Sequence, residues 1–277
     1  MKKLGLIAIG LILPILLIGQ TSKTSCNSGK SCLELGHKQL EQEKYDSALA
    51  SYKRSCNFNY VEGCGAAFNF LNTSQSLDVA INFLSQSCDN NKNAVACSLI
   101  GYFYFKDENY TKALPYAIKG CNLQNALSCL MATGIYENNK NTAKYLEFGK
   151  KACDLKDTED RAGVCREVGL EFNKIQNYKQ ALNAFNTACN LQDATSCAML
   201  GSYFYGITNG VIQQNTAKAF EFTKKSCNLG LARGCFQLSL LYEEFERNIY
   251  KAREYAKKSC NMGLQEACQH YQELLQY

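Results

Sequence analysis

Sixteen cysteines are the residues of this chain whose type and spacing could do chemistry. Cysteine thiolates bind zinc, act as nucleophiles, exchange with disulfides or pair as permanent bridges. Zinc and redox sites usually use a Cys-x-x-Cys spacing, which is absent from the sequence. The cysteines instead form eight pairs whose members lie 6 to 12 positions apart: Cys26 and Cys32, Cys56 and Cys64, Cys88 and Cys97, Cys121 and Cys129, Cys153 and Cys165, Cys189 and Cys197, Cys227 and Cys235, and Cys260 and Cys268. This spacing favours structural disulfides, and full pairing would leave no thiol for nucleophilic catalysis.

Other groups that could do chemistry are few. The two histidines, His37 and His270, lie near opposite ends of the chain and cannot share a metal within one molecule. We expect both on the solvated surface, and we expect neither a metal nor another cofactor. The acidic segments Lys156–Arg161 and Tyr242–Arg247 are expected to be a junction loop and a solvated helix face, not catalytic pairs.

The elements that position the cysteines repeat along the chain. The second cysteines of the pairs recur every 32 to 38 residues, which is the period of a solenoid. Apolar residues three, four and seven positions after each second cysteine predict one helix, with a small residue in mid-face for close packing. A second helix is predicted to end on the next first cysteine, where an Asn or Asp suits a left-handed helix end. The pattern therefore predicts an all-α solenoid of antiparallel helix pairs.

Two pairings of the cysteines suit such a hairpin array. Long-range bridges, from Cys32 with Cys56 to Cys235 with Cys260, would leave Cys26 and Cys268 unpaired, whereas local bridges use all sixteen. We therefore expect eight local disulfides, one at each junction between units, each worth about 2.5 kcal/mol in the chain-entropy account.

The N-terminus predicts the compartment. Lys2 and Lys3 precede an apolar run over residues 4–18, so residues 1–22 are expected to be a signal peptide, with an uncleaved anchor as the alternative. Residues 23–277 would then form about seven helix pairs and a C-terminal capping helix, secreted or periplasmic, with no stable membrane span. The mature charge, near +3 once Lys2 and Lys3 are removed from the +5 of the whole chain, is too mild to imply a nucleic-acid partner or an anionic membrane.

The segment CAMLGSYFYGITNGVIQQNTAKAFEFTKKSCNLGLARGC, residues 197–235, resembles a Sel1-like (TPR-like) repeat. With its paired cysteines and signal peptide, the chain from about Ser31 onward resembles the Helicobacter cysteine-rich protein family. The Gly-x-Gly turn of that family is replaced at Lys106–Asn109 and Lys174–Asn177. The resemblance implies a scaffold that binds proteins along a concave surface. It also implies, as the alternative, a β-lactam (penicillin)-binding protein with weak β-lactamase activity, whose ligand would be a β-lactam or a peptidoglycan-like small molecule.

The motifs of the alternative are missing. After the signal segment the sequence contains no Ser-x-x-Lys, Ser-Asp-Asn, Lys-Thr-Gly or Gly-x-Ser-x-Gly, so catalytic residues cannot be assigned. A protein or peptide bound in the groove is the primary expectation. The groove should be lined by residues two and five positions after the second cysteines, unless some of these belong to the core between repeats: Leu99, Tyr102, Met131, Glu167, Met199, Ser202 and Gln237.

Overall fold

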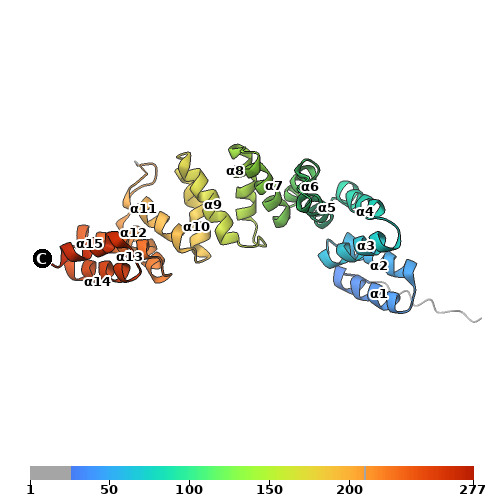
Figure 1. Cartoon of the computed structure of the whole chain (residues 1–277), viewed down its shortest axis with the longest axis horizontal. Helices are drawn as coiled ribbons and strands as arrows, with labels where there is room; N and C mark the ends of the chain where they lie inside the picture. The colour runs from blue at the N-terminus through green and yellow to red at the C-terminus, as the bar shows by residue number, and fades with distance from the viewer. Residues whose placement is uncertain (1–25, 209) are drawn as a thin grey trace, which may run out of the picture.

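A computed structural model describes residues 26–208 and 210–277, and these fold into fifteen α-helices (Figure 1). The expected signal peptide, residues 1–22, lies outside the described residues. The helices are α1 (Gly29–Glu41), α2 (Tyr45–Asn57), α3 (Val61–Ser74), α4 (Leu77–Asn90), α5 (Ala94–Lys106), α6 (Tyr110–Asn122), α7 (Ala126–Asn138), α8 (Thr142–Asp154), α9 (Arg161–Lys174), α10 (Tyr178–Asn190), α11 (Ala194–Tyr205), α12 (Thr216–Asn228), α13 (Ala232–Glu244), α14 (Ile249–Asn261) and α15 (Gln265–Leu274).

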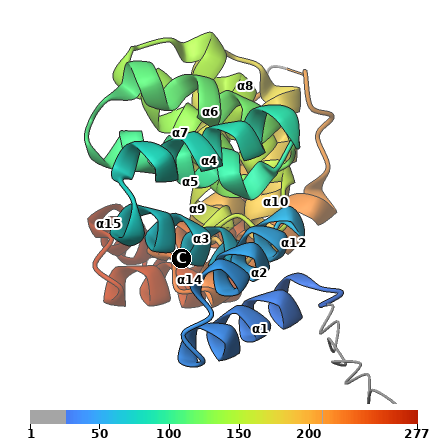
Figure 2. The same cartoon turned by 90° about the vertical axis from the view of Figure 1, so that its right-hand side faces the viewer.

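The helices pack as consecutive pairs in a solenoid, which confirms the expected fold class. Each odd helix except α3 packs most extensively against the even helix that follows it, α3 packs more against α2 than against α4, and α15 packs against α14. The pairs are strung along one axis (Figure 1) and turn about it, so that α6 and α8 lie on the opposite side from α1 and α14 (Figure 2). Within the described residues no helix is long and apolar enough to cross a membrane.

Eight disulfides close the junctions of the array. They join the cysteines in the local pairs: Cys26 with Cys32, Cys56 with Cys64, Cys88 with Cys97, Cys121 with Cys129, Cys153 with Cys165, Cys189 with Cys197, Cys227 with Cys235, and Cys260 with Cys268. The first ties the segment before α1 to that helix, and the other seven connect the last turn of an even helix to the next odd helix. The local pairing that uses every cysteine is therefore the one in the structure, and the long-range alternative is wrong.

The spacers between paired cysteines differ in length, but the bridges span similar distances. The Cα atoms of Cys56 and Cys64, eight positions apart, lie 4.3 Å from each other. Those of Cys153 and Cys165, twelve positions apart, lie 4.9 Å from each other. The additional residues before Cys165 lengthen the loop between α8 and α9 and leave the junction itself unchanged.

Small residues allow the two helices of a pair to approach closely. The alanines that lie eight positions before the first cysteines are fully buried: Ala48, Ala80, Ala113, Ala181, Ala219 and Ala252. A Cβ on Gly169 of α9 would lie 2.6 Å from the ring of Phe185 on α10, which has no exposed surface. The predicted residue in the middle of the first helix's buried face must therefore be small, because the second helix of the same pair packs against it.

The left-handed residue of the junction turns lies elsewhere than the sequence predicted. The Asn after a first cysteine, such as Asn190, is the last residue of its helix and is helical. The left-handed residue comes two positions later, at Gln192 with φ of 69° and at Gly230 with φ of 88°. That residue reverses the chain so that Asp193 can donate its N–H to the carbonyl of Ala188 and cap α11.

The two turns in which the expected glycines are missing, α5/α6 and α9/α10, share one geometry. Glu108 and Gln176 adopt φ of 55° and 58° in place of a glycine. The Asn that follows each of them, Asn109 or Asn177, accepts a backbone hydrogen bond in the first turn of α6 or α10. A side chain can occupy the left-handed position, so sequence departures there do not change the fold.

Candidate functional site

The odd helices line the inner side of the array. From α1 to α7, and again at α11 and α13, consecutive odd helices contact one another more closely than consecutive even helices do. We call the surface of α3, α5, α7, α9, α11 and α13 on this side the groove. Of the residues expected there, Tyr102 and Glu167 are exposed, and Leu99, Met199, Ser202 and Gln237 are half-buried.

The first hollow of the groove lies between α3 and α5. It is a cavity of about 410 Å³, bounded by Phe68 of α3 and by Leu99, Tyr102 and Phe103 of α5. At Gly65 of α3 a Cβ would meet no atom within 4 Å, so the space above this glycine is open. Lys106 and Asp107 stand at its edge, which leaves an apolar, aromatic hollow with a charged rim.

The second hollow lies between α11 and α13. It is a cavity of about 220 Å³ whose apolar wall includes Tyr205, Leu240 and Leu241. Gln237 donates from Nε2 to the Ser202 hydroxyl over 2.7 Å, and its Oε1 is buried with no partner among the described residues. Whichever way this amide is oriented, one of its polar atoms lacks a partner.

The two hollows are equivalent positions of the repeat. Each lies between a residue five positions after one second cysteine, Asn69 or Ser202, and residues two, five and six positions after the next. The residues at two, five and six are Leu99, Tyr102 and Phe103 in one hollow, and Gln237, Leu240 and Leu241 in the other. The offsets two and five were in the sequence expectation, but the offset six and the residues Phe103 and Leu241 were missed.

Met131 does not line the groove, in contrast to the expectation. It is 3% exposed and belongs to the core of α6, α7 and α8. Its Cε would lie 3.2 Å from a Cβ on Gly101, because the flexible thioether fills the space left by that glycine. The interface between α5 and α7 is therefore filled where the interfaces of α3 with α5 and of α11 with α13 are hollow.

Acidic residues of α7 and α9 surround Tyr145, a half-buried tyrosine of α8. Burial raises the pKa of Tyr145 to about 12, with a further contribution from the charges of Glu137, Glu167 and Glu171. Lys174 forms an ion pair with Glu171. These contacts make the middle of the groove polar between its two apolar hollows.

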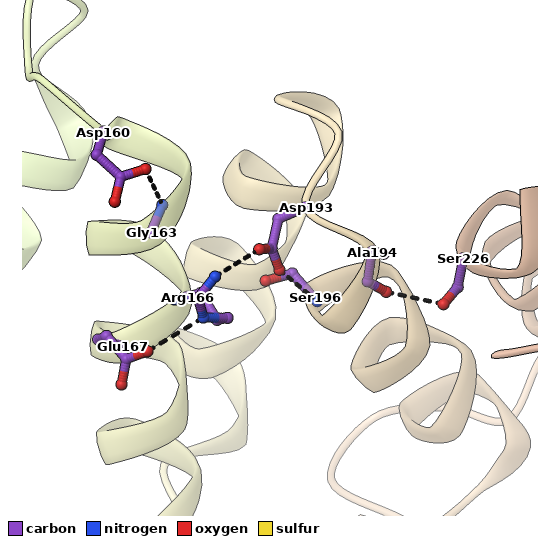
Figure 3. A network of polar contacts seen from close by, with 8 residues as sticks. All are labelled: Asp160, Gly163, Arg166, Glu167, Asp193, Ala194, Ser196 and Ser226. Carbon is purple, nitrogen blue, oxygen red and sulfur yellow. Dashed lines mark hydrogen bonds and ion pairs between the residues drawn. The ribbon is translucent and has the colours of Figure 1, made fainter. Parts of the chain in front are cut away.

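A polar network fixes α9 against α11 beside Glu167 (Figure 3). Arg166 donates to Glu167 over 3.1 Å and to Asp193 over 2.8 Å, and Asp193 also accepts from the backbone of Ser196. Burial opposes ionisation of Asp193, but the hydrogen bonds from Ser196 and Arg166 outweigh it and lower its pKa. Arg166 therefore joins α9 to the start of α11, and every charge of the network has a partner.

Among the residues that the structure describes, no group of side chains matches a catalytic or metal centre. The hydroxyl of Ser202 faces the neutral amide of Gln237, which cannot act as a base. Within residues 26–208 and 210–277 there is no free cysteine and no cluster of metal-ligating side chains. His37, exposed, contacts the Tyr52 hydroxyl over 3.2 Å.

His270 is not the solvated surface residue that we expected. Its side chain is 13% exposed, and it lies 3.2 Å from a carboxylate oxygen of Glu243 and 3.7 Å from one of Glu273. Its ring meets Phe236 edge to face. The terminal helix α15 packs this side chain against α13, which explains its burial.

The helix pairs of this chain are similar to repeats of known proteins. Residues 194–231 and 232–264 match the Sel1 repeat. Cytochrome c oxidase assembly factor 7 of Xenopus tropicalis is 25% identical over 222 residues, covering 76% of this chain and 82% of that protein. A protective antigen of uropathogenic Escherichia coli with an SLR fold is similar in structure at a TM-score of 0.51 and 16% identity. The match covers 90% of this chain but only 57% of the antigen's length. A Sel1 repeat protein from Oxalobacter formigenes has a TM-score of 0.43 and 15% identity, covering 82% of this chain and 96% of that one.

The two matched segments are the helix pairs α11/α12 and α13/α14. The preceding pairs repeat their helix order and their junction disulfide, and all of them except α7/α8 repeat their buried alanine. The chain is therefore a Sel1-like repeat protein in which regularly spaced disulfides close the junctions between its helix pairs.

Proposed function

We propose that the protein is an exported scaffold that binds an extended segment of another protein in its groove. The observation that carries the proposal is the pair of equivalent apolar hollows, at α3/α5 and at α11/α13. Extended partners bind repeat arrays by seating apolar side chains in such hollows while the polar surface between them excludes wrong partners. The segment we propose has apolar anchor residues, one for each hollow.

Export is part of the same proposal. Eight disulfides would be reduced in a cytosol and persist in an oxidising compartment. The apolar segment 4–18 and the paired cysteines also support membership of the Helicobacter cysteine-rich family. The amphibian relative is named as an assembly factor, which agrees with a scaffold. Since no described side chain favours penicillin turnover, binding of a protein segment is the function we propose.

The test is selection of peptides from a random display library on the oxidised protein, followed by fluorescence polarisation. Gly65→Leu fills the hollow at α3/α5, and Leu240→Glu, at a residue 38% exposed, places a charge in the hollow at α11/α13. Leu127→Glu is the matched control, because Leu127 is a comparably exposed leucine (42%) of an odd helix that lines neither hollow.

Selected peptides are expected to contain apolar anchors and to lose at least tenfold in affinity, about 1.4 kcal/mol, for Gly65→Leu or Leu240→Glu. Leu127→Glu should bind as the unchanged protein does. Peptides that bind all three variants equally would show that the hollows are not the binding site.

A further inference from the structure

The even helices α12 and α14 concentrate net positive charge. Together they contain six lysines and Arg253 against Glu221 and Glu254, a net charge of +5. The described residues total +2, because the chain's +5 includes Lys2, Lys3 and Lys23 in residues 1–25, a segment without acidic residues. The remainder of the described chain is therefore net negative, and two neighbouring helices concentrate the opposite charge.

Five of the six lysines are exposed and Lys225 is half-buried, and we call them together the basic face: Lys218, Lys224, Lys225, Lys251, Lys257 and Lys258. Lys224 and Lys225 lie three and two positions before Cys227, and Lys257 and Lys258 have the same places before Cys260. The buried side of each helix is opposite, at Ala219 and Thr223 in α12 and at Ala252 and Ala256 in α14. The disulfide of Cys227 with Cys235 joins α12 to α13, and that of Cys260 with Cys268 joins α14 to α15.

This positive charge is not neutralised within the described structure. None of the six lysines forms an ion pair there, although Lys218 and Lys251 lie over the rings of Phe204 and Tyr242. Helix α8 has the same lysine arrangement, but Lys144 and Lys151 contact Glu147, and Lys150 contacts Asp154. Asp154 stands where α12 and α14 have Asn228 and Asn261, so α8 retains less net charge.

Three features favour a membrane surface as the partner. Lysine is a compact, hydrated point charge without the planar fork that binds single carboxylates, so it suits a surface of distributed anions. Six lysines lie within the range of four to eight that attracts a protein to anionic lipid. Tyr250, 78% exposed in the first turn of α14, offers the amphipathic ring that favours the headgroup region.

We propose that the basic face binds anionic lipid headgroups at a bilayer surface. Because the face lies on the even helices, the groove of the odd helices then points away from the bilayer and stays open to its partner. The inference is independent of the proposed groove function, since it uses neither hollow.

The test is co-sedimentation with vesicles of phosphatidylcholine containing about one-third phosphatidylglycerol, against vesicles of phosphatidylcholine alone. The variant replaces four lysines of the basic face (Lys224→Gln, Lys225→Gln, Lys257→Gln, Lys258→Gln). The control removes the same charge from α6 and α8, where the lysines have acidic partners (Lys119→Gln, Lys144→Gln, Lys150→Gln, Lys151→Gln).

The unchanged protein is expected to bind the anionic vesicles and to be released at about 0.5 M salt. The basic-face variant should lose at least about 100-fold in partitioning, and the control variant far less. Binding to neutral vesicles alone, an equal loss in both variants, or no binding while an acidic polypeptide is retained would each overturn the proposal. Thermal melts and groove-peptide binding of both variants show whether the fold and the groove are intact.

Discussion

At the residue scale, the residue before the first cysteine of a pair packs against the residue before the second. In three of the pairs the space between them holds only one side chain. Where Ser55 or Ser226 precedes the first cysteine, Gly63 or Gly234 precedes the second, and a Cβ on either glycine would overlap the serine. In the pair of Cys121 and Cys129 the order is reversed, so that Ser128 occupies the space above Gly120. Ser55 and Ser226 donate to the carbonyls of Gly29 and Ala194, whereas the Ser128 hydroxyl is buried without a partner in the described structure.

Exchanging this pair tests the packing. Gly120→Ser alone is expected to destabilise, because its side chain overlaps Ser128. The double variant Gly120→Ser with Ser128→Gly should have a free energy of unfolding about 1 kcal/mol above that of the unchanged protein. The new hydroxyl at position 120 can donate to the carbonyl of Ala94, and the unpaired hydroxyl of Ser128 is removed. Urea denaturation of the single and double variants measures this. A double variant no more stable than Gly120→Ser would contradict the shared-space account.

At the element scale, a left-handed residue stands two positions after the last residue of every even helix except α8, whatever its side chain. Gln124 and Gln192 occupy the position where Gly230 and Gly263 stand in later repeats, all with positive φ. The helix periodicity was predictable from the cysteine spacing and the apolar offsets. The turn position was not, because a glutamine or lysine there carries no marker of a left-handed backbone.

Gln192→Gly is expected to stabilise the protein by about 0.5–1 kcal/mol, because glycine adopts positive φ without the cost that a side chain incurs. The reverse change at the equivalent position, Gly230→Gln, should destabilise by a similar amount. Differences in melting temperature between these two variants and the unchanged protein measure both effects. Shifts of the same sign would mean that backbone strain does not govern the turn.

The pattern of the helices predicts which residues face the groove, but not which interfaces between helices are hollow. Leu99, Tyr102, Ser202 and Gln237, at offsets two and five, line the hollows, and their role in binding stays a prediction. Whether an interface is hollow depends on the size of its neighbours, as Met131 against Gly101 shows, and periodicity carries no such information. The burial of His270 likewise results from the packing of α15 on α13, which its position near the chain end did not reveal.

At the scale of the whole molecule, each helix pair contacts only its neighbours, so stability depends on the junctions. A bridge of this loop length contributes about 2.5 kcal/mol in the chain-entropy account, and eight such bridges are distributed along the array. Solenoid order and local pairing followed from the sequence because the repeat is strict. The size and position of the hollows did not, since they arise between units.

Reduction is expected to destabilise the array throughout. With a phosphine reductant the melting temperature should fall by roughly 15 °C or more, because every junction loses its constraint. Replacing only Cys26 and Cys32 by alanine should lower the melting temperature much less, since this bridge closes only one end of the array. Melts followed by circular dichroism test both, and an unchanged temperature after complete reduction would show that the bridges do not stabilise the fold.

The central claim is that the hollows between odd helices hold the partner. The most direct measurement is photo-cross-linking of a selected peptide whose apolar anchor is replaced by a photoreactive residue, with the adducts mapped by mass spectrometry. The account predicts adducts on α3 and α5 or on α11 and α13, and their loss in Gly65→Leu or Leu240→Glu. Adducts on the even helices, or spread evenly along the array, would contradict it.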